Sequence, residues 1–185
     1  MPESDEHTLI AAAQQDPQHF DPFYRRYVPR IYAYAYRQTG SREVAEDITA
    51  STFEKALAHI DSYRPQGSSP AAWLYKIALN EIRKNYWKQR LLRPLHEADT
   101  SPVNVEQAVQ AHEQTRVLWA ALAHISQADR QLLTLRFFEE LSSAEVANIL
   151  GCSLPQLYLR LHRALKRLRK QIDHQAIEGV SYVSE

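Results

Sequence analysis

Helical periodicity with few interruptions is the feature of this sequence that most restricts its fold. Apolar residues recur every three or four positions through most of the chain, whereas the strict alternation typical of half-buried strands is scarce. Glycine, which weakens the interior of a helix, lies only between the periodic segments or in the tail. Its four positions are Gly40, Gly67, Gly151 and Gly179. The sequence therefore predicts an all-α fold.

The first half of the chain divides into four expected helices, which are separated by residues that favour caps and turns. These helices cover residues 8–15, 16–40, 41–63 and 70–90. Within the second of them, Pro29 should kink or interrupt the helix, because proline has no N–H to donate. Residues 64–69 form a loop by their composition.

The second half begins with a polar and acidic stretch over residues 94–112, in which helix is expected to resume near Val105. Further helices are expected over residues 113–124, 126–139, 142–150 and 153–172, and the tail after Asp173 should be frayed. We therefore expect two small helical domains, residues 1–93 and 113–172. A linker over residues 94–112 joins them, and a tail over residues 173–185 follows.

Residues 143–161 have the pattern of a helix-turn-helix. Ala147 is small enough for two helices to approach closely, and Gly151, four residues later, suits a left-handed turn between them. Each helix opens with a capping box, at Ser142 with Glu145 and at Ser153 with Gln156.

The second helix of this motif has two expected faces. Its inward face carries Leu154, Leu157, Leu161, Leu165, Leu168 and Ile172, and its outward face carries Gln156, Arg160, Arg163, Arg167 and Lys170. Several cations on a helix whose N-terminus is exposed fit contact with duplex DNA. The alternative is a solvated basic face on an ordinary helical hairpin.

A formal net charge of zero conceals two strongly basic blocks. Residues 64–93 and residues 146–172 each carry a net charge of +6, and the compensating acids lie in the segments around them. Charge segregation of this kind indicates contact with nucleic acid or with a charged partner.

The first basic block is a helix in which cations alternate with aromatic residues. Its expected buried stripe consists of Trp73, Leu74, Ile77, Ala78 and Ile82, and its outward cations are Arg83, Lys84, Lys88, Arg90 and Arg93. Tyr86 and Trp87 lie between these cations. Exposed aromatics beside cations fit unstacked bases, whereas the alternative places both rings in the core of the bundle.

Four motifs in order resemble one family. They are residues 23–32 (FYRRYVPRIY), residues 45–48 with Thr52 and Phe53, residues 72–80 (AWLYKIALN), and residues 160–164 (RLHRA). Their order and spacing resemble the bacterial sigma factors of the extracytoplasmic-function type, which are small RNA polymerase initiation factors. The resemblance covers residues 18–90 and 113–170.

The resemblance implies a sigma region 2-like bundle that binds and melts the −10 element, and a region 4-like domain that reads the −35 element. The residues expected on duplex −35 DNA are Gln156, Leu159, Arg160, Arg163 and Arg167. Those expected on the melted −10 strand are Arg64, in the loop that pockets a flipped base, and Asn80, Arg83, Lys84, Trp87 and Lys88. Those expected to bind the β′ coiled coil of core RNA polymerase are Asp47, Ile48, Ser51 and Phe53, although Phe53 is equally compatible with the core.

Two departures from the family pattern fall at residues expected to contact polymerase or DNA. Ala50 and Ser51 replace the Gln and Glu that the family often has, which bears on polymerase docking. Residues 155–159 (PQLYL) replace a common Gly-Thr-Val-Lys-Ser. Leu159 would then contact thymine methyl groups or form part of a protein-binding surface.

Other classes of function lack their motifs. The eight histidines show no His-Glu-x-x-His spacing, and no nucleophile elbow or Gly-rich phosphate loop is present. We therefore expect neither an enzyme nor a metal or other cofactor. The single cysteine, Cys152, allows no internal disulfide, and the absence of a membrane-length apolar run and of a secretory signal indicates a cytoplasmic protein without membrane insertion.

The expected partners are core RNA polymerase and promoter DNA, and the resemblance also implies an anti-sigma protein. Two alternatives remain open. One is a stand-alone helix-turn-helix regulator that does not engage polymerase, and the other is a protein-interaction module whose basic faces hold an acidic partner.

Overall fold

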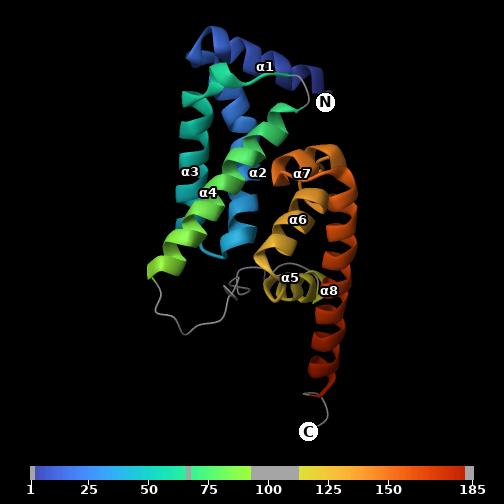
Figure 1. The fold of residues 1–185 in the computed structure, drawn as a ribbon. Helices are drawn as coiled ribbons and strands as arrows, with labels where there is room; N and C mark the ends of the chain where they lie inside the picture. The colour runs from blue at the N-terminus through green and yellow to red at the C-terminus, as the bar shows by residue number, and fades with distance from the viewer. Residues whose placement is uncertain (1–2, 66–67, 93–112, 182–185) are drawn as a thin grey trace.

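The computed structural model describes residues 3–65, 68–92 and 113–181, and within them every regular element is a helix (Figure 1). The first group contains α1 (Glu3–Gln15), η1 (Pro17–Phe20), α2 (Asp21–Thr39), α3 (Arg42–Ala58), η2 (Ile60–Ser62) and α4 (Pro70–Leu92). The second group contains α5 (Glu113–Ala123), α6 (Gln127–Phe137), α7 (Ser143–Leu150) and α8 (Leu154–Ser181). The all-α prediction is confirmed, and the helix expected near Val105 lies outside the described residues.

Side-chain caps begin helices, and left-handed glycines end them, at the positions that the sequence predicted. The hydroxyls of Ser41, Ser126 and Ser142 each accept a backbone N–H in the first turn of the helix that follows. Gly40 and Gly151 end α2 and α7 with φ of 67°, a conformation in which glycine lacks the steric penalty of other residues.

Several expected boundaries were wrong. Helix α1 begins at Glu3 rather than at residue 8, and Pro17 opens a separate 3-10 turn. Pro29 does not interrupt α2, because Phe23, Tyr27, Ile31 and Tyr34 are buried on both sides of it and hold one continuous helix against the core. Helix α8 continues to Ser181 instead of fraying after Asp173; helix growth is cooperative, and no glycine or proline intervenes before Gly179.

The core of the first group is rich in aromatic residues. Phe23, Tyr27 and Tyr34 from α2 are fully buried, as are Leu74 and Tyr75 from α4. The Tyr34 and Tyr75 rings meet edge to face with their centroids 5.3 Å apart. This packing fixes α4 beside α2 and directs the opposite face of α4 to solvent.

In the second group, α7 and α8 pack on α6 as a helix-turn-helix. Val146, Ala147, Leu157 and Ala164 are buried between these helices. Leu154 and Leu165, which were expected to face inward, are exposed, because the stripe that α8 buries is narrower and runs through Leu157, Ala164 and Leu168.

The two groups also contact one another, chiefly through α4 with α7 and α2 with α6 (Figure 1). Buried apolar residues form one continuous cluster across both groups. Among the described residues, no helix is long and apolar enough to cross a membrane.

Candidate nucleic-acid interface

The N-terminal half of α8 presents an exposed basic face. Gln156 closes the first turn, because its side chain accepts the Ser153 N–H at 3.2 Å while its own N–H reaches the Ser153 hydroxyl at 3.4 Å. The predicted duplex contacts Gln156, Leu159, Arg160 and Arg163 are all exposed, and Leu159 keeps 51% of its surface accessible. A helix that starts at a tight turn and presents cations outward has the form required for major-groove contact.

Arg167 differs from the other predicted duplex contacts, because it is already paired. Its Nε and Nη2 donate to the two carboxylate oxygens of Asp129 in α6, at 2.7 and 2.8 Å. These hydrogen bonds hold the pKa of Arg167 above its ordinary value. Arg167 therefore anchors α8 to α6 and keeps the basic face in a fixed orientation.

Helix α4 presents the second basic face. Asn80, Arg83, Lys84 and Lys88 are exposed on it, and Trp87 has 60% of its surface accessible. Tyr86 is half-buried on another side of the helix. Of the two aromatics that interrupt the cations, Trp87 is therefore placed to stack on a base.

The loop before α4 brings Arg64 and two serines to the N-terminal end of that helix. Arg64 is exposed, and its guanidinium donates to the backbone oxygens of Asp61 and Tyr63 at 2.6 and 2.9 Å. Ser69 Oγ accepts the Ala72 N–H at 3.1 Å and so caps α4. Residues 66 and 67 of this predicted base pocket lie outside the described residues.

Helix α3 carries the predicted polymerase contacts on different sides. Asp47 is exposed, whereas Ile48 and Phe53 are 3% and 5% accessible and belong to the core. Ser51 Oγ donates to Glu81 of α4 at 2.9 Å. Both residues support α3 from its inner side, which agrees with the core alternative stated for Phe53 and leaves the side chain of Ile48 inaccessible to a partner in this structure.

Glu81 joins α3 to the basic helix. Its burial opposes ionisation, but hydrogen bonds from Lys55 and Ser51 outweigh this effect and hold the pKa of the carboxyl below its ordinary value. The contacts of Lys55 and Ser51 with Glu81 therefore position α3 relative to the cations on α4.

A buried carboxylate connects the two groups of helices. Glu139, in the turn after α6, is 2% accessible. Its Oε1 lies 2.5 Å from Arg37 Nη1 of α2, and its Oε2 accepts the hydroxyl of Tyr75 of α4. Arg30 Nη2 donates to the Glu139 backbone oxygen at 3.0 Å. Burial raises the pKa of Glu139, and these donors oppose that rise without cancelling it.

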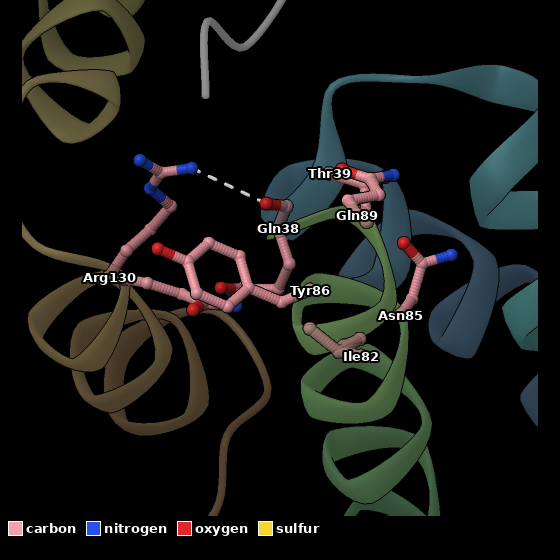
Figure 2. A pocket seen from close by; sticks show the side chains of 8 residues that line it. Gln38, Thr39, Ile82, Asn85, Tyr86, Gln89 and Arg130 are labelled. Atoms are coloured by element: carbon pink, nitrogen blue, oxygen red, sulfur yellow. Dashed lines mark hydrogen bonds between the residues drawn. The ribbon is translucent and has the colours of Figure 1, made fainter. Parts of the chain in front are cut away.

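A second polar junction lies between α2 and α6 (Figure 2). The buried Arg130 guanidinium donates to the backbone oxygens of Leu122 and Ala123, at 3.0 and 2.9 Å, and to that of Gln38, at 3.3 Å. These oxygens belong to the last turns of α5 and α2, where a cation is favoured by the helix dipoles. The amide of the Gln38 side chain, also buried, has no hydrogen-bond partner within residues 3–65, 68–92 and 113–181.

Sequence reasoning missed Glu139, Arg37 and Arg130. Each acts across a separation of more than 90 residues between the two groups, and a local pattern carries no signal for such a pairing. No cluster of metal-ligating side chains occurs among the residues that the structure describes.

Comparisons with known proteins agree with this geometry. The Sigma-70 region 2 family model matches residues 23–91, and the Sigma-70 region 4 model matches residues 115–168. The chain is 33% identical over 158 residues to the RNA polymerase sigma factor YlaC of Bacillus subtilis, which covers 82% of this chain and 91% of YlaC. It is also 33% identical over 144 residues to the ECF sigma factor EcfG of Rhodopseudomonas palustris, covering 76% of this chain and 78% of EcfG.

A longer relative and two solved structures complete the comparison. The ECF sigma factor BldN of Streptomyces coelicolor is 28% identical over 85% of this chain, and the matched part spans 61% of BldN. CnrH in complex with the cytosolic domain of CnrY aligns with a TM-score of 0.69 at 23% identity, over 91% of this chain and 97% of that one. RpoE of Bartonella quintana in complex with the anti-sigma factor NepR aligns with a TM-score of 0.67 at 24% identity, over 83% and 96%. The two solved structures share the fold.

Proposed function

The chain belongs to the extracytoplasmic-function family of RNA polymerase sigma factors, and we propose that it recognises promoters through the two basic faces of α8 and α4. It binds core RNA polymerase and directs promoter recognition and DNA melting. The observation that carries the residue assignment is the exposure of both cationic faces, one of them with an accessible tryptophan.

Helix α8 would position the protein on the duplex −35 element. Arg160 and Arg163 lie on its exposed face for phosphate and base contacts, and Gln156 lies near its N-terminus. Arg167 contributes by holding this face in place through Asp129.

Helix α4 and its preceding loop would capture the melted −10 strand. Stacking on Trp87 stabilises an unpaired base by about 1–3 kcal/mol, and the cations Arg83, Lys84 and Lys88 attract the phosphates beside it. Arg64 and Asn80 would contact the flipped base. Such contacts offset an unstacking cost of about a few kcal/mol for each base.

Polymerase docking is assigned to the exposed side of α3, with Asp47 as its centre. Family members act in initiation without catalysing a reaction of their own, and we extend this to the present chain, in the cytoplasm and without a cofactor. The complex of RpoE with the anti-sigma factor NepR supports an anti-sigma protein as a further partner.

Run-off transcription with core polymerase on a genomic DNA library tests this assignment. The wild-type chain should yield discrete transcripts, and Trp87→Ala should reduce them on linear duplex while pre-melted templates restore activity. Phe137→Ala, which removes an exposed aromatic side chain from α6, away from the surfaces assigned to DNA and to polymerase, serves as the matched control.

Two results would support the other classes. Failure to associate with core polymerase at low salt favours a stand-alone DNA-binding regulator. Absence of any salt-dependent DNA binding favours a protein-interaction module, because phosphate contacts necessarily release counterions.

A further inference from the structure

Helix α1 precedes the residues that the region 2 model matches, which begin at residue 23, yet it is packed on the first group. Ile10 and Ala13 are fully buried, and Glu6 Oε1 lies 3.2 Å from Arg26 Nη2 of α2. Figure 1 shows α1 lying across one end of the first group, where it contacts η2 and α4. The loop over residues 64–69 connects η2 to α4, so α1 is fixed beside the predicted base pocket.

Gln14 of α1 directs its amide at the backbone that leads into this loop. Its Nε2 donates to the backbone oxygens of Ile60 and Tyr63, at 2.9 and 3.1 Å. The Tyr63 oxygen also accepts the guanidinium of Arg64 at 2.9 Å, so both of its lone pairs are used. One side chain of α1 thus fixes the point from which Arg64 extends.

Tyr63 joins the two arms of the loop. Its side chain is buried, and its hydroxyl donates to the backbone oxygen of Ser68 at 2.8 Å. Burial and the nearby charge of Glu6 raise the pKa of Tyr63 to about 12, so the hydroxyl keeps its proton at neutral pH. Because that single proton is directed to Ser68, His7 Nδ1, which lies 3.1 Å from the same hydroxyl, must donate the second hydrogen bond. Helix α1 therefore contacts both the backbone and the side chain of Tyr63.

We propose that α1 fixes the shape of the predicted base pocket, with Gln14 and Tyr63 as positioning residues that hold Arg64 and Ser68 at the spacing that admits a flipped base. This inference deepens the proposed function and rests on it. Neither side chain needs to touch the base, because each acts through the backbone of the loop.

A loop that is held in place before the base arrives captures it more favourably. Ordering a loop during binding costs conformational entropy, which is subtracted from the free energy of capture. The hydrogen bonds of Gln14 and Tyr63 already restrict both arms in the free chain. Capture of a base must also offset its unstacking, so a loss of this restriction should reduce promoter melting.

The test compares Gln14→Glu with Gln15→Glu. Glutamate has nearly the shape of glutamine but carries no N–H, so at position 14 it places a carboxylate against two carbonyl oxygens. Gln15 is exposed, and its substitution adds the same charge one residue away. Gln14→Lys, paired with Gln15→Lys, restores a donor toward both carbonyls. Gln14→Met, paired with Gln15→Met, removes the donor without adding a charge and replaces Gln14→Glu if that variant does not fold.

Hydrogen exchange on the free chain measures the hold on the loop. The Tyr63 N–H donates to the Ile60 oxygen and the Ala72 N–H to Ser69 Oγ, so these two amides report the two ends of the loop. In Gln14→Glu both should exchange at least about tenfold faster than in Gln15→Glu, while the amides of α2 and α3 are unchanged. Equal exchange in the two variants would overturn the inference.

Base discrimination by the holoenzyme measures the consequence. Each base of the −10 strand is replaced in turn in promoters that the wild-type chain melts, and permanganate reactivity of unpaired thymines measures opening. Gln14→Glu and Tyr63→Phe should lose at least about tenfold of the discrimination at one position, and Gln14→Lys should retain it. A loss spread equally over all positions, or discrimination equal to that of Gln15→Glu, would show that Gln14 does not position the pocket. Full discrimination in Tyr63→Phe would likewise refute the role of Tyr63.

The two proposals fail in different ways. Hydrogen exchange is measured without polymerase or DNA, so it reports whether α1 holds the loop even if no promoter is melted. Absence of melting and of transcripts with the wild-type chain would instead count against the proposed function.

Discussion

At the scale of single residues, Glu139 should make the stability of the fold depend on pH. Burial raises the pKa of its carboxyl in the folded chain, and Tyr75, Arg37 and Arg30 only partly oppose this. In the unfolded chain the carboxyl is hydrated, with an ordinary pKa of about 4.3. Because the folded state has the higher pKa, protonation of Glu139 favours folding. This contribution is complete below the ordinary pKa and is lost as the pH rises through the raised one.

The stability that Glu139 contributes should accordingly decrease as the pH rises from about 5 to about 7, which urea unfolding of the wild-type chain across this range measures. Glu139→Gln is the control, because it removes this titration and leaves the histidines and all other acids in place. An equal decrease in Glu139→Gln would show that another group governs the pH dependence.

Leu159 gives a second test at this scale, because its side chain is exposed on the face assigned to the duplex. If it contacts a thymine methyl group, Leu159→Ser should weaken binding to the preferred duplex by about 1–3 kcal/mol and relax the base preference at one position. Binding to competing DNA sequences measures this. Tyr158→Ser, an adjacent exposed position, is the control, and unchanged base preference in Leu159→Ser would assign Leu159 to a protein contact.

At the scale of elements, local rules predicted the helices well. Ser41, Ser126 and Ser142 cap helices as expected, because a cap depends only on residues three or four positions away. The predictions failed where tertiary packing determines whether a helix continues or a side chain is buried. Pro29 is tolerated because the core holds α2 on both sides of it, and Leu165 is exposed because α8 buries only a narrow stripe.

The turn between α7 and α8 gives a test of such a local rule. Gly151 has φ of 67°, and a Cβ added there would meet nothing within 4 Å. Gly151→Ala should therefore reduce the free energy of unfolding by about 1 kcal/mol through backbone conformation alone. Urea unfolding measures the loss. Gly151→Asn should retain most of the stability, because asparagine tolerates the left-handed region, and equal losses in both variants would contradict this explanation.

At the scale of the whole molecule, sequence reasoning located both basic faces but none of the contacts between the groups. Charge segregation is additive along the chain and can be read from segments, so the α4 and α8 faces were predictable. The Glu139–Arg37 and Arg130–Gln38 contacts each join residues more than 90 positions apart and depend on how two complete helical groups meet. Even in the core, the burial of Ile48 and Phe53 followed from α3 packing rather than from motif position.

The zero net charge has its own consequence at this scale. Each basic block carries a charge of +6, while acidic segments elsewhere cancel it, so the free chain should be attracted only weakly to DNA. We expect tight promoter binding only when core polymerase holds the two groups at promoter spacing, because the second contact then forms at a high effective concentration. Electrophoretic mobility shifts at physiological salt, with and without core polymerase, measure this difference.

Charge cancellation also predicts how weak binding by the free chain can be improved. Glu140→Lys removes an acid and adds a base at an exposed position outside both basic blocks. If cancellation by the acidic segments limits affinity, this variant should bind a promoter fragment more tightly than the wild type, with a similar slope against salt because the phosphate contacts are the same. Tight and specific binding by the unmodified free chain at physiological salt would contradict this explanation, because the acidic segments would then not limit the affinity of the basic faces.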